Sequence, residues 1–410
     1  MRRKLTIASV VSLCTVPMLL PSQDASAIPV FARKYQTSCY TCHSGFPTRN
    51  AFGEAFRNNG YRWPGGEDED KSKQEQLKLG ADGWKKTFPE TPWPGEIPGY
   101  APVSLWIRGD LLKFTQETTN PNGTVNTKQL LNNSNGPLGS TTLFFGGTMG
   151  DNLSAFGQYN MGATATAATG HLIWAFKPGI NVAFGNGFTE WSFGNAISTY
   201  TGTFPTQGLG TEFTYTTGDK GGFKLAAGSS QNGNAVATAA NSVNDLMYLR
   251  AKYKFGGAGL LSGAGGTYGN EFVGLDNHIA LGATYVNIKK GVLTTGNYAG
   301  ETAVYGADVT GNIGNLSLGA AYSRDQDLKL DNYRVDAIYF LYPWMKATMT
   351  YANVRSGDKA NQPTVAAGVT AHLRANAYLT ALYTYQTKER NTPTSVSNPD
   401  TFALTAGFCF

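Results

Sequence analysis

The chain has 410 residues, and its 33 Lys and Arg against 28 Asp and Glu give a formal net charge of +5 at pH 7. This near balance offers no concentrated basic face, which excludes nucleic acid as an expected partner. Fifty glycines, 12% aromatic residues and only 15% charged residues are typical instead of an all-β chain with many turns.

The first 27 residues have the pattern of a secretory signal peptide. Three basic residues at positions 2–4 precede an apolar run over 7–20, and a small-x-small cleavage site follows at 25–27. The run is shorter than the roughly 20 residues that a membrane-spanning helix needs. We therefore expect residues 1–27 to be removed on export, so that the mature chain begins at Ile28.

Three cysteines follow the expected cleavage site, and two of them lie close together. Cys39, Cys42 and His43 form a C-x-x-C-H motif, the attachment pattern of a c-type haem. Two thiols three positions apart can form thioethers to the two vinyl groups of one haem, and the next residue can place an imidazole on the iron. A thioredoxin-like dithiol would need a βαβ context, and a zinc site a second Cys/His pair; the sequence offers neither. The motif predicts one covalent haem c on Cys39 and Cys42, with His43 as the proximal iron ligand.

Residues 28–100 are expected to form this small haem domain from helical and irregular structure. The pattern predicts a helix over 48–58 with Thr48 as its N-terminal cap. Phe52 and Phe56 share one face of that helix, four positions apart. We expect them to pack both on the domain itself and against the haem face, because the haem would be the main apolar core of this small segment.

Two further segments complete this domain. The acidic run at residues 67–70 is interpreted as a solvated helix start rather than a metal site. Four prolines between residues 89 and 98 predict a stiff linker. The expected organisation is therefore a signal peptide over 1–27, a monohaem cytochrome c domain with its linker over 28–100, and a second domain over 101–410.

Residues 101–410 repeat segments of about ten residues in which apolar and polar side chains alternate. Alternation of period two predicts strands with one apolar and one polar face. Short turns and long polar loops also alternate, which is the pattern of an outer-membrane barrel. We expect an all-β transmembrane barrel of about 16–18 antiparallel strands, with a soluble β-sandwich or solenoid as the alternative.

The alternation predicts which side chains face lipid and where the turns lie. The apolar rows include Leu172, Trp174 and Phe176; Ile279, Leu281, Ala283 and Tyr285; and Tyr333, Val335, Ala337, Tyr339 and Leu341. Short turns are expected at 177–179, 218–220, 256–258 and 373–374, and long loops at 117–138, 230–244 and 386–399.

The last segment favours a membrane barrel over a soluble one. Its apolar row is Phe402, Leu404, Ala406, Phe408 and Phe410, and Cys409 is expected to point inward. An amphipathic strand that ends on an aromatic residue resembles the C-terminal insertion signal of bacterial outer-membrane barrels.

The sixth position on the haem iron has no evident ligand within residues 28–100, which contain no second His and no Met. The sixth ligand therefore comes from the barrel, is a weaker group, or is absent. Strand parity points His372 into the lumen close to a short turn, and makes it the candidate distal ligand. His171 and His278 also point inward, and we expect both near the outer rim. Met345 and Met349 share the apolar face of their strand, which favours lipid contact over ligation. An ordinary lumen position is the alternative for each histidine.

Eight charged side chains are expected to face the lumen: Arg108, Asp110, Arg250, Lys252, Asp308, Arg334, Asp336 and Lys346. They either pair with one another in a wet lumen or support the haem propionates and a charged electron donor. The pattern does not separate these two interpretations.

Several of these motifs together resemble a known family. PVFARKY at 29–35, the C-x-x-C-H, Phe46-Pro47 and Phe52-Gly53-Glu54 resemble the N-terminus of the fused monohaem cytochrome–porins. These are outer-membrane proteins of iron-oxidising bacteria. The motifs cover roughly residues 28–65, whereas the barrel agrees in length and texture only.

The resemblance implies a small cytochrome domain that plugs a porin-like barrel of about 16 strands. It implies that Cys39 and Cys42 hold the haem and that His43 ligates its iron. The implied function is electron transfer across the outer membrane, from extracellular Fe(II) to a periplasmic c-type cytochrome. The corresponding enzyme activity is that of an Fe(II):cytochrome c oxidoreductase. The implied location is the bacterial outer membrane and its lipid.

Two other functions fit the same architecture. Electrons could flow outward to an extracellular metal acceptor, since the direction depends on potentials that the sequence does not give. Alternatively, the chain could be a diffusion porin whose haem segment is only a plug or sensor.

Overall fold

A computed structural model gives the fold. It describes residues 30–44, 48–64, 68–72, 76–77, 83, 86–87, 89–90, 97–98, 102–115, 118–120, 123–125, 140–150, 152–161, 168–188, 204, 207–232, 244–263, 268–270, 275–289, 291–292, 297–298, 301–327, 329–356, 362–386 and 400–409. The expected signal peptide over 1–27 and most of the expected linker lie outside these residues.

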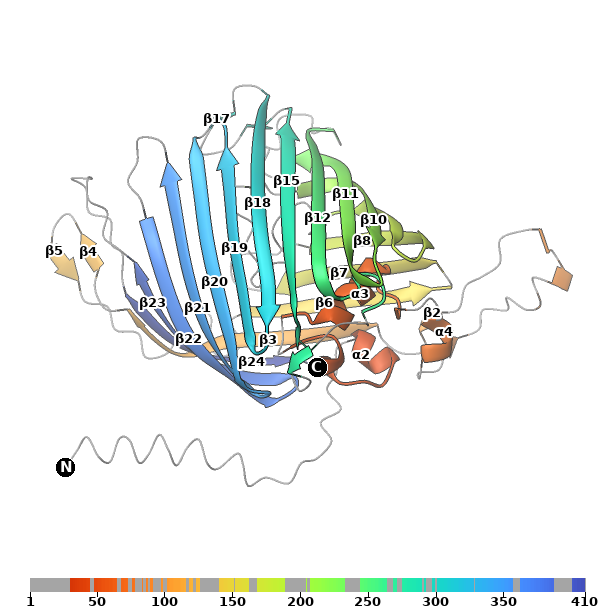
Figure 1. Ribbon diagram of the computed structural model, residues 1–410, viewed down its shortest axis with the longest axis horizontal. Coiled ribbons are helices and arrows are strands. Elements are labelled where there is room, and N and C mark those ends of the chain that lie inside the picture. Colours follow the sequence, from red (N-terminus) through yellow and green to blue (C-terminus); the bar gives the residue numbers. More distant parts are fainter. Residues whose placement is uncertain are drawn as a thin grey trace.

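Sixteen of the described strands form one closed antiparallel barrel (Figure 1). This confirms the all-β barrel, at the lower end of the expected strand count. The first and last barrel strands pair with each other and close the ring. The barrel strands are β3 (Val103–Thr115), β6 (Ser140–Met149), β7 (Leu153–Met161), β8 (Ala168–Lys177), β9 (Ile180–Gly185), β10 (Gln207–Thr217), β11 (Lys220–Asn232), β12 (Leu246–Ala258), β15 (His278–Ile288), β18 (Thr302–Ile313), β19 (Leu316–Asp325), β20 (Leu330–Tyr342), β21 (Met345–Ser356), β22 (Gln362–Arg374), β23 (Ala377–Gln386) and β24 (Thr401–Cys409).

The remaining elements are short. The helices are α2 (Val30–Lys34), the 3-10 turn η2 (Cys39–Thr41), α3 (Ala51–Asn58) and α4 (Asp68–Lys71). Four two-stranded ribbons are built from β1 (Gln76–Leu77) with β2 (Ile97–Pro98), β4 (Thr118–Asn120) with β5 (Gly123–Val125), β13 (Tyr268–Asn270) with β14 (Leu275–Asp276), and β16 (Gly291–Val292) with β17 (Asn297–Tyr298). Among the described residues, no helix combines the length and the apolar character needed to cross a membrane.

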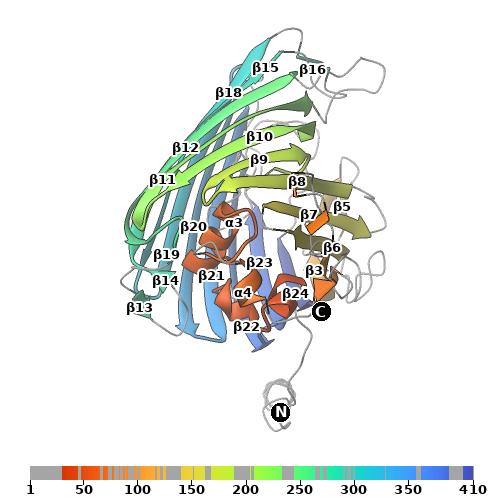
Figure 2. The same ribbon diagram turned by 90° about the vertical axis from the view of Figure 1, so that its right-hand side faces the viewer.

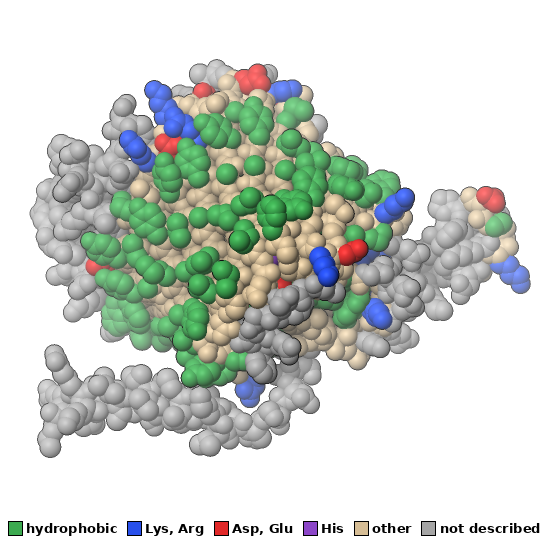
Figure 3. All heavy atoms as spheres, viewed as in Figure 1, with side chains coloured by type: hydrophobic (Ala, Val, Ile, Leu, Met, Phe, Trp, Pro, Cys, Tyr) green, Lys and Arg blue, Asp and Glu red, His purple; other side chains and the backbone are tan. Residues whose placement is uncertain are grey.

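The outer surface of the barrel is apolar, as the alternation predicts. On β8, Trp174 and Phe176 are 44% and 61% exposed, while Ile173 and Ala175 between them are buried. Successive side chains of a strand point to opposite faces, so each apolar row of period two covers the outside of the wall. Figure 3 shows these hydrophobic side chains spread over the strands, with most charged side chains near the edges. The predicted outward rows on β15 and β20 are likewise exposed.

The turns divide the barrel into two rims. We call the end with the connectors 178–179, 218–219, 314–315, 343–344 and 375–376 the short-turn rim, and the opposite end the long-loop rim. The turns expected at 177–179 and 218–220 are confirmed, as are the three long connectors. The turn expected at 373–374 lies two residues later, because β22 and β23 remain paired as far as Arg374 and Ala377.

The short turn expected at 256–258 is wrong. Gly256 and Gly257 have φ of +67° and +69°, and they form an irregularity within β12 rather than ending it. Glycine tolerates this left-handed conformation, which suits a bulge as well as a turn. The next barrel strand begins only at His278, so a long connector joins β12 to β15 at the short-turn rim.

The N-terminal helices α2 and α3 lie within the mouth of the barrel at the short-turn rim (Figures 1 and 2). The end of α3 is hydrogen-bonded to three strands of the wall. The Asn58 carbonyl accepts from Asn181 Nδ2 at 2.8 Å, Asn58 Oδ1 accepts from Lys224 Nζ at 2.6 Å, and the Gly60 carbonyl accepts from Ser154 Oγ at 2.7 Å. These bonds fix the segment against β7, β9 and β11.

The expected helix over 48–58 is shorter than predicted, and Thr48 is not its cap. Asn50 caps α3, since its Oδ1 accepts from the Gly53 backbone N–H at 2.9 Å. Thr48 instead lies before the helix, where its carbonyl accepts from the Ser44 N–H at 2.9 Å. That backbone bond holds Thr48 beside the C-x-x-C-H segment and outside the helix.

Candidate functional site

The C-x-x-C-H motif forms one tight turn. Cys39–Thr41 is a single 3-10 turn, and the Cys39 carbonyl accepts from the N–H groups of Cys42 at 3.2 Å and His43 at 3.0 Å. The Ser38 hydroxyl accepts from the Tyr40 N–H at 3.3 Å and caps the start of the turn. Both cysteines are free thiols. The turn therefore presents two thiols and an imidazole from five consecutive residues.

Asn50 joins this turn to α3. Its Nδ2 donates to the carbonyls of Tyr40 at 3.0 Å and Thr41 at 3.1 Å, while its backbone N–H donates to the Cys42 carbonyl at 3.0 Å. With the Gly53 bond, one buried side chain satisfies a helix start and two carbonyls of the motif. The sequence pattern did not single out Asn50, although Asn is a preferred capping residue.

The environment of the cysteines disfavours thiolate chemistry. Burial raises the pKa of Cys42 to about 12, and the nearby Cys39 adds to the rise. Burial also raises the pKa of Cys39. A buried thiol with a raised pKa is a poor nucleophile, which weakens the redox-dithiol interpretation of the motif.

Aromatic side chains form the core beside the motif. Phe52 contacts Trp63 with ring centroids 4.8 Å apart, and Trp63 contacts Tyr35 at 5.0 Å. Phe56 packs edge-on against Phe31 at 5.2 Å. The two phenylalanines therefore pack within the N-terminal segment, as expected; their contact with a haem stays a prediction.

The acidic run at 67–70 is not a fully solvated helix start, because Asp68 is buried. Asp68 forms an ion pair with Lys34, accepts from the Tyr35 hydroxyl at 2.5 Å and accepts from the Trp63 N–H at 2.9 Å. Burial alone would raise its pKa, but Lys34 and these hydrogen bonds hold the pKa of Asp68 below its ordinary value. The carboxylate ties α2 to the aromatic core.

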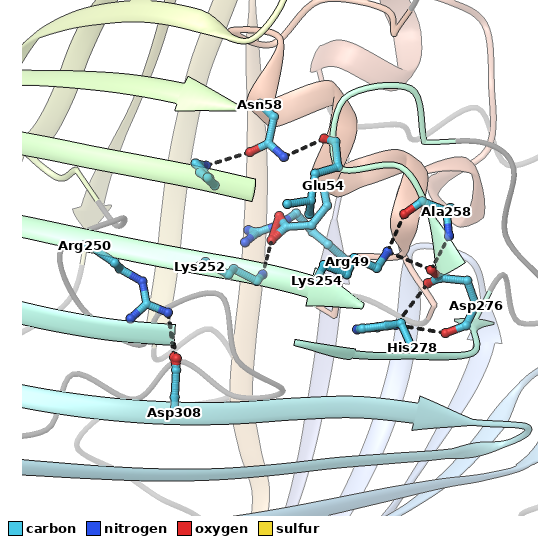
Figure 4. A network of polar contacts seen from close by, with 12 residues as sticks. Arg49, Glu54, Asn58, Arg250, Lys252, Lys254, Ala258, Asp276, His278 and Asp308 are labelled. Carbon is cyan, nitrogen blue, oxygen red and sulfur yellow. Dashed lines mark hydrogen bonds and ion pairs between the residues drawn. The ribbon is translucent and has the colours of Figure 1, made fainter. Parts of the chain in front are cut away.

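Glu54 links α3 to the barrel wall (Figure 4). Its carboxylate lies 3.1 Å from Arg49 Nε and 3.7 Å from Lys252 Nζ of β12. Burial would raise its pKa, but the cations of Arg49, Lys252, Arg57 and Lys224 hold the pKa of Glu54 at about 2. The carboxylate therefore stays charged at neutral pH and pairs the segment with the wall.

His278 lies at the short-turn rim, and its expected place near the outer rim is wrong. β15 runs away from the short-turn rim rather than toward it, because the connector after β12 is long. Asp276 accepts from Lys254 Nζ at 2.7 Å and lies 3.5 Å from His278 Nδ1 (Figure 4). His278 Nδ1 also lies 2.9 Å from the Asp276 carbonyl.

Other inward charges pair with one another, as the first of their two interpretations predicts. Arg250 Nη2 lies 2.6 Å from Asp308 Oδ1, and Arg334 Nε lies 2.8 Å from Asp336 Oδ2. Asp110 accepts from the Thr405 hydroxyl at 2.7 Å. A role toward haem propionates or a charged donor stays a prediction.

A cavity of about 450 Å³ lies between α3 and the barrel wall. This is within the roughly 300–1,000 Å³ of typical small-molecule sites. Its described lining carries five cations against three carboxylates: Arg49, Arg108, Lys252, Lys254 and Lys346 face Glu54, Asp276 and Asp336. The cavity therefore favours an anionic occupant. Groups of three or more His, Cys, Asp or Glu that could hold a metal ion are not found within the described ranges.

His372 of β22 points inward and is 6% exposed. Its ring lies 6.3 Å from that of Tyr40, between the two cysteines of the motif, and 5.7 Å from that of Tyr378. His171 lies on β8, where its Nδ1 is 3.1 Å from the Asn186 carbonyl and its ring is 6.4 Å from that of Tyr61. The structure thus brings one of the three candidate histidines to the motif.

Met349 and the side chains of the last strand point in the directions that the alternation predicts. Met349 is 57% exposed on the outside of β21, which confirms its outward direction. Cys409 is buried at 4% exposure, as expected, and Phe402 and Phe408 are exposed. Phe410 lies outside the described residues.

No protein-family model matches the chain, and no curated protein matches it. Solved structures do. OmpF of Salmonella typhi, solved in complex with daunomycin, aligns over 82% of this chain and 100% of its own, with a TM-score of 0.50 and 13% identity. The chain has a porin-like barrel.

Two further solved structures align less closely. The anion-selective porin from Comamonas acidovorans covers 75% of this chain and 99% of its own, at a TM-score of 0.48 and 10% identity. OprB of Pseudomonas putida covers 75% of this chain and 93% of its own, at a TM-score of 0.45 and 11% identity. At these identities the likeness concerns the fold alone.

Proposed function

We propose that this chain is an outer-membrane electron carrier, in which a covalent haem c sits in the mouth of a porin-like barrel. Cys39 and Cys42 hold the haem, His43 ligates its iron, and electrons pass from extracellular Fe(II) to a periplasmic c-type cytochrome. The observation that carries the proposal is the placement of the C-x-x-C-H turn inside the barrel mouth, where Asn50 and α3 fix it.

The residues around the motif fit a haem. Two protonated thiols can add to the two vinyl groups, and the adjacent imidazole can bind iron. The cavity beside Arg49 has a surplus of positive charge, which suits a porphyrin that carries two carboxylates. When bound, the iron would alternate between ferric and ferrous states and so carry one electron. The barrel would shield it from bulk water, and burial helps to set its potential.

The barrel surface supports the membrane location. Large apolar side chains such as Trp174, Leu281 and Val335 are 44–49% exposed on its outside, an arrangement that lipid stabilises and water does not. Short turns lie on the periplasmic side of such barrels, so the N-terminal segment would occupy the periplasmic mouth. A haem at that mouth could meet a periplasmic cytochrome directly.

The proposal is tested on protein made together with a c-type haem maturation system. Purified protein should carry one haem that resists extraction, and Fe(II) should reduce it in stopped-flow absorbance measurements. The Cys39→Ala/Cys42→Ala double variant is the control, since the barrel should insert without covalent haem. Protein with an intact motif and no attached haem would refute the proposal.

A diffusion porin with an N-terminal plug is the second candidate. The likeness to OmpF supports this candidate directly, since it concerns the barrel alone. Solute flux through reconstituted full-length protein, with no reduction of the haem by Fe(II), would favour it. Outward electron transfer to an extracellular metal is a third possibility; a haem potential far below that of the Fe(III)/Fe(II) couple would favour that direction.

A further inference from the structure

His372 is a buried imidazole with an unusual lack of partners. It is 6% exposed, and neither Nδ1 nor Nε2 has a hydrogen-bond partner among the described residues. Leaving a buried polar group without a partner costs free energy, so nearly all such groups in folded proteins are satisfied. A partner that is not a protein side chain is therefore expected at this ring.

The other two lumen histidines do not share this property. His171 Nδ1 lies 3.1 Å from the Asn186 carbonyl, and His278 Nδ1 lies 2.9 Å from the Asp276 carbonyl. Both therefore have a local hydrogen-bonding role. His372 alone among the three has two open ring nitrogens.

The position of His372 relates it to the motif. Its ring contacts that of Tyr40, which is the residue after Cys39, at a centroid distance of 6.3 Å. The other side of the ring packs on Tyr378, whose hydroxyl accepts from Trp106 Nε1 at 3.1 Å. This packing holds the imidazole in one orientation at the base of the lumen.

Residues that neighbour both candidate ligands line the cavity, although neither histidine is itself part of the lining. On one side it is lined by Thr48 and Arg49, and Arg49 pairs with His43 in a β-bridge. On the other side it is lined by Thr370, which lies two positions before His372 on β22, and by Tyr378 of β23, which pairs with His372. A group that extends from this cavity would therefore meet neighbours of both histidines.

We propose that His372 is the second axial ligand of the haem iron, opposite His43. This inference rests on the proposed function, because it requires the haem. Two imidazoles would make the iron six-coordinate, and the iron would then join the N-terminal segment to strand β22. The haem would thereby fasten the segment inside the barrel in addition to its hydrogen bonds.

The test uses the full-length holoprotein in detergent, with His372→Ala, His372→Met and His171→Ala as the control. The parent ferric protein should be low-spin by electron paramagnetic resonance and slow to bind carbon monoxide when reduced. His372→Ala should convert it to a high-spin form that binds carbon monoxide readily, and added imidazole should restore the low-spin form. His372→Met should remain low-spin with a raised potential, because a thioether ligand favours ferrous iron. His171→Ala should match the parent.

Two results would overturn the inference. One is a parent protein whose ferric haem is already high-spin, a measurement that needs no variant and no refolding. The other is a low-spin His372→Ala protein with an unchanged potential. Both leave the proposed function intact, since both require a haem attached through Cys39 and Cys42; absence of covalent haem would instead refute the proposed function itself.

Discussion

Gly53 lies directly against Cys42: a Cβ on Gly53 would be 2.1 Å from the Cys42 carbonyl oxygen. No side chain fits at that distance, so α3 can approach the motif only because this residue is glycine. The close approach brings the start of α3, capped by Asn50, onto the turn that carries both thiols.

Gly53→Ala should therefore separate α3 from the C-x-x-C-H turn. We expect haem attachment to fall at least tenfold, because the thiols and the imidazole lose their common frame. The pyridine haemochrome assay on purified protein measures attached haem per chain. Gly83→Ala is the matched control, since a Cβ there meets nothing within 4 Å. Equal haem content in the two variants would contradict the role of Gly53.

Two substitutions of Asn50 should destabilise the N-terminal segment to different extents. Asn50→Ala removes the cap and both donors to Tyr40 and Thr41, and should destabilise the segment by about 1–2 kcal/mol from the cap alone. Asn50→Asp keeps the acceptor for Gly53 and loses only the donors, so it should be milder. Limited proteolysis of the N-terminal segment in the intact barrel measures which of the two variants is more sensitive to protease. Equal protease sensitivity of the two variants would mean that the donors dominate and the cap contributes little.

The buried Asp68 carboxylate should make the stability of the N-terminal segment depend on pH. Its pKa is lower in the folded chain than in the unfolded one. Its carboxylate therefore stabilises the fold fully above the unfolded value of about 3.9, and this contribution is lost as the pH falls toward the folded value. Protease resistance of the segment should be constant between about pH 7 and pH 5 and should decline below about pH 4.

Asp68→Asn tests the same contact at neutral pH. Removing one partner of a buried ion pair leaves Lys34 uncompensated and should destabilise the segment by about 3–5 kcal/mol. The control is Asp327→Asn, at an exposed turn on the long-loop rim. A proteolysis rate for Asp68→Asn that matches the control would show that the pair contributes nothing.

Deletion of residues 28–72 should turn the chain into an open channel. Barrels of 16 strands leave an aqueous lumen when nothing fills them, and here Asn58 and Glu54 tie α3 across it. Planar-bilayer recordings should show a larger and steadier conductance for the deletion variant than for the full chain. Equal conductance would mean that the N-terminal segment does not obstruct the lumen.

The barrel could be predicted because its signal is local and repeated. Trp174 and Phe176 alternate with Ile173 and Ala175, and strand geometry converts that spacing directly into outside and inside. Glycine pairs are less informative, because the pair at 256–257 fits a turn and a bulge equally well. Reading it as a turn led to the wrong prediction that His278 lies near the outer rim.

The site could be predicted only in part. The motif residues are contiguous, so Cys39, Cys42 and His43 stand out from spacing alone. Asn50 and Thr48 are both good capping residues, and only the backbone bond from Ser44 to Thr48 decides between them. Burial of Asp68 depends on Lys34, 34 positions earlier, a contact that no local pattern reveals.

We propose above that the motif in the barrel mouth carries a haem that accepts electrons from Fe(II). Stopped-flow mixing of the purified holoprotein with Fe(II) under anaerobic conditions, followed at the haem Soret and α bands, tests it most directly. We expect rapid reduction of one covalently attached haem per chain, and no such reduction in the Cys39→Ala/Cys42→Ala variant. A chain that binds no haem, or a haem that Fe(II) leaves oxidised across the accessible pH range, would contradict it.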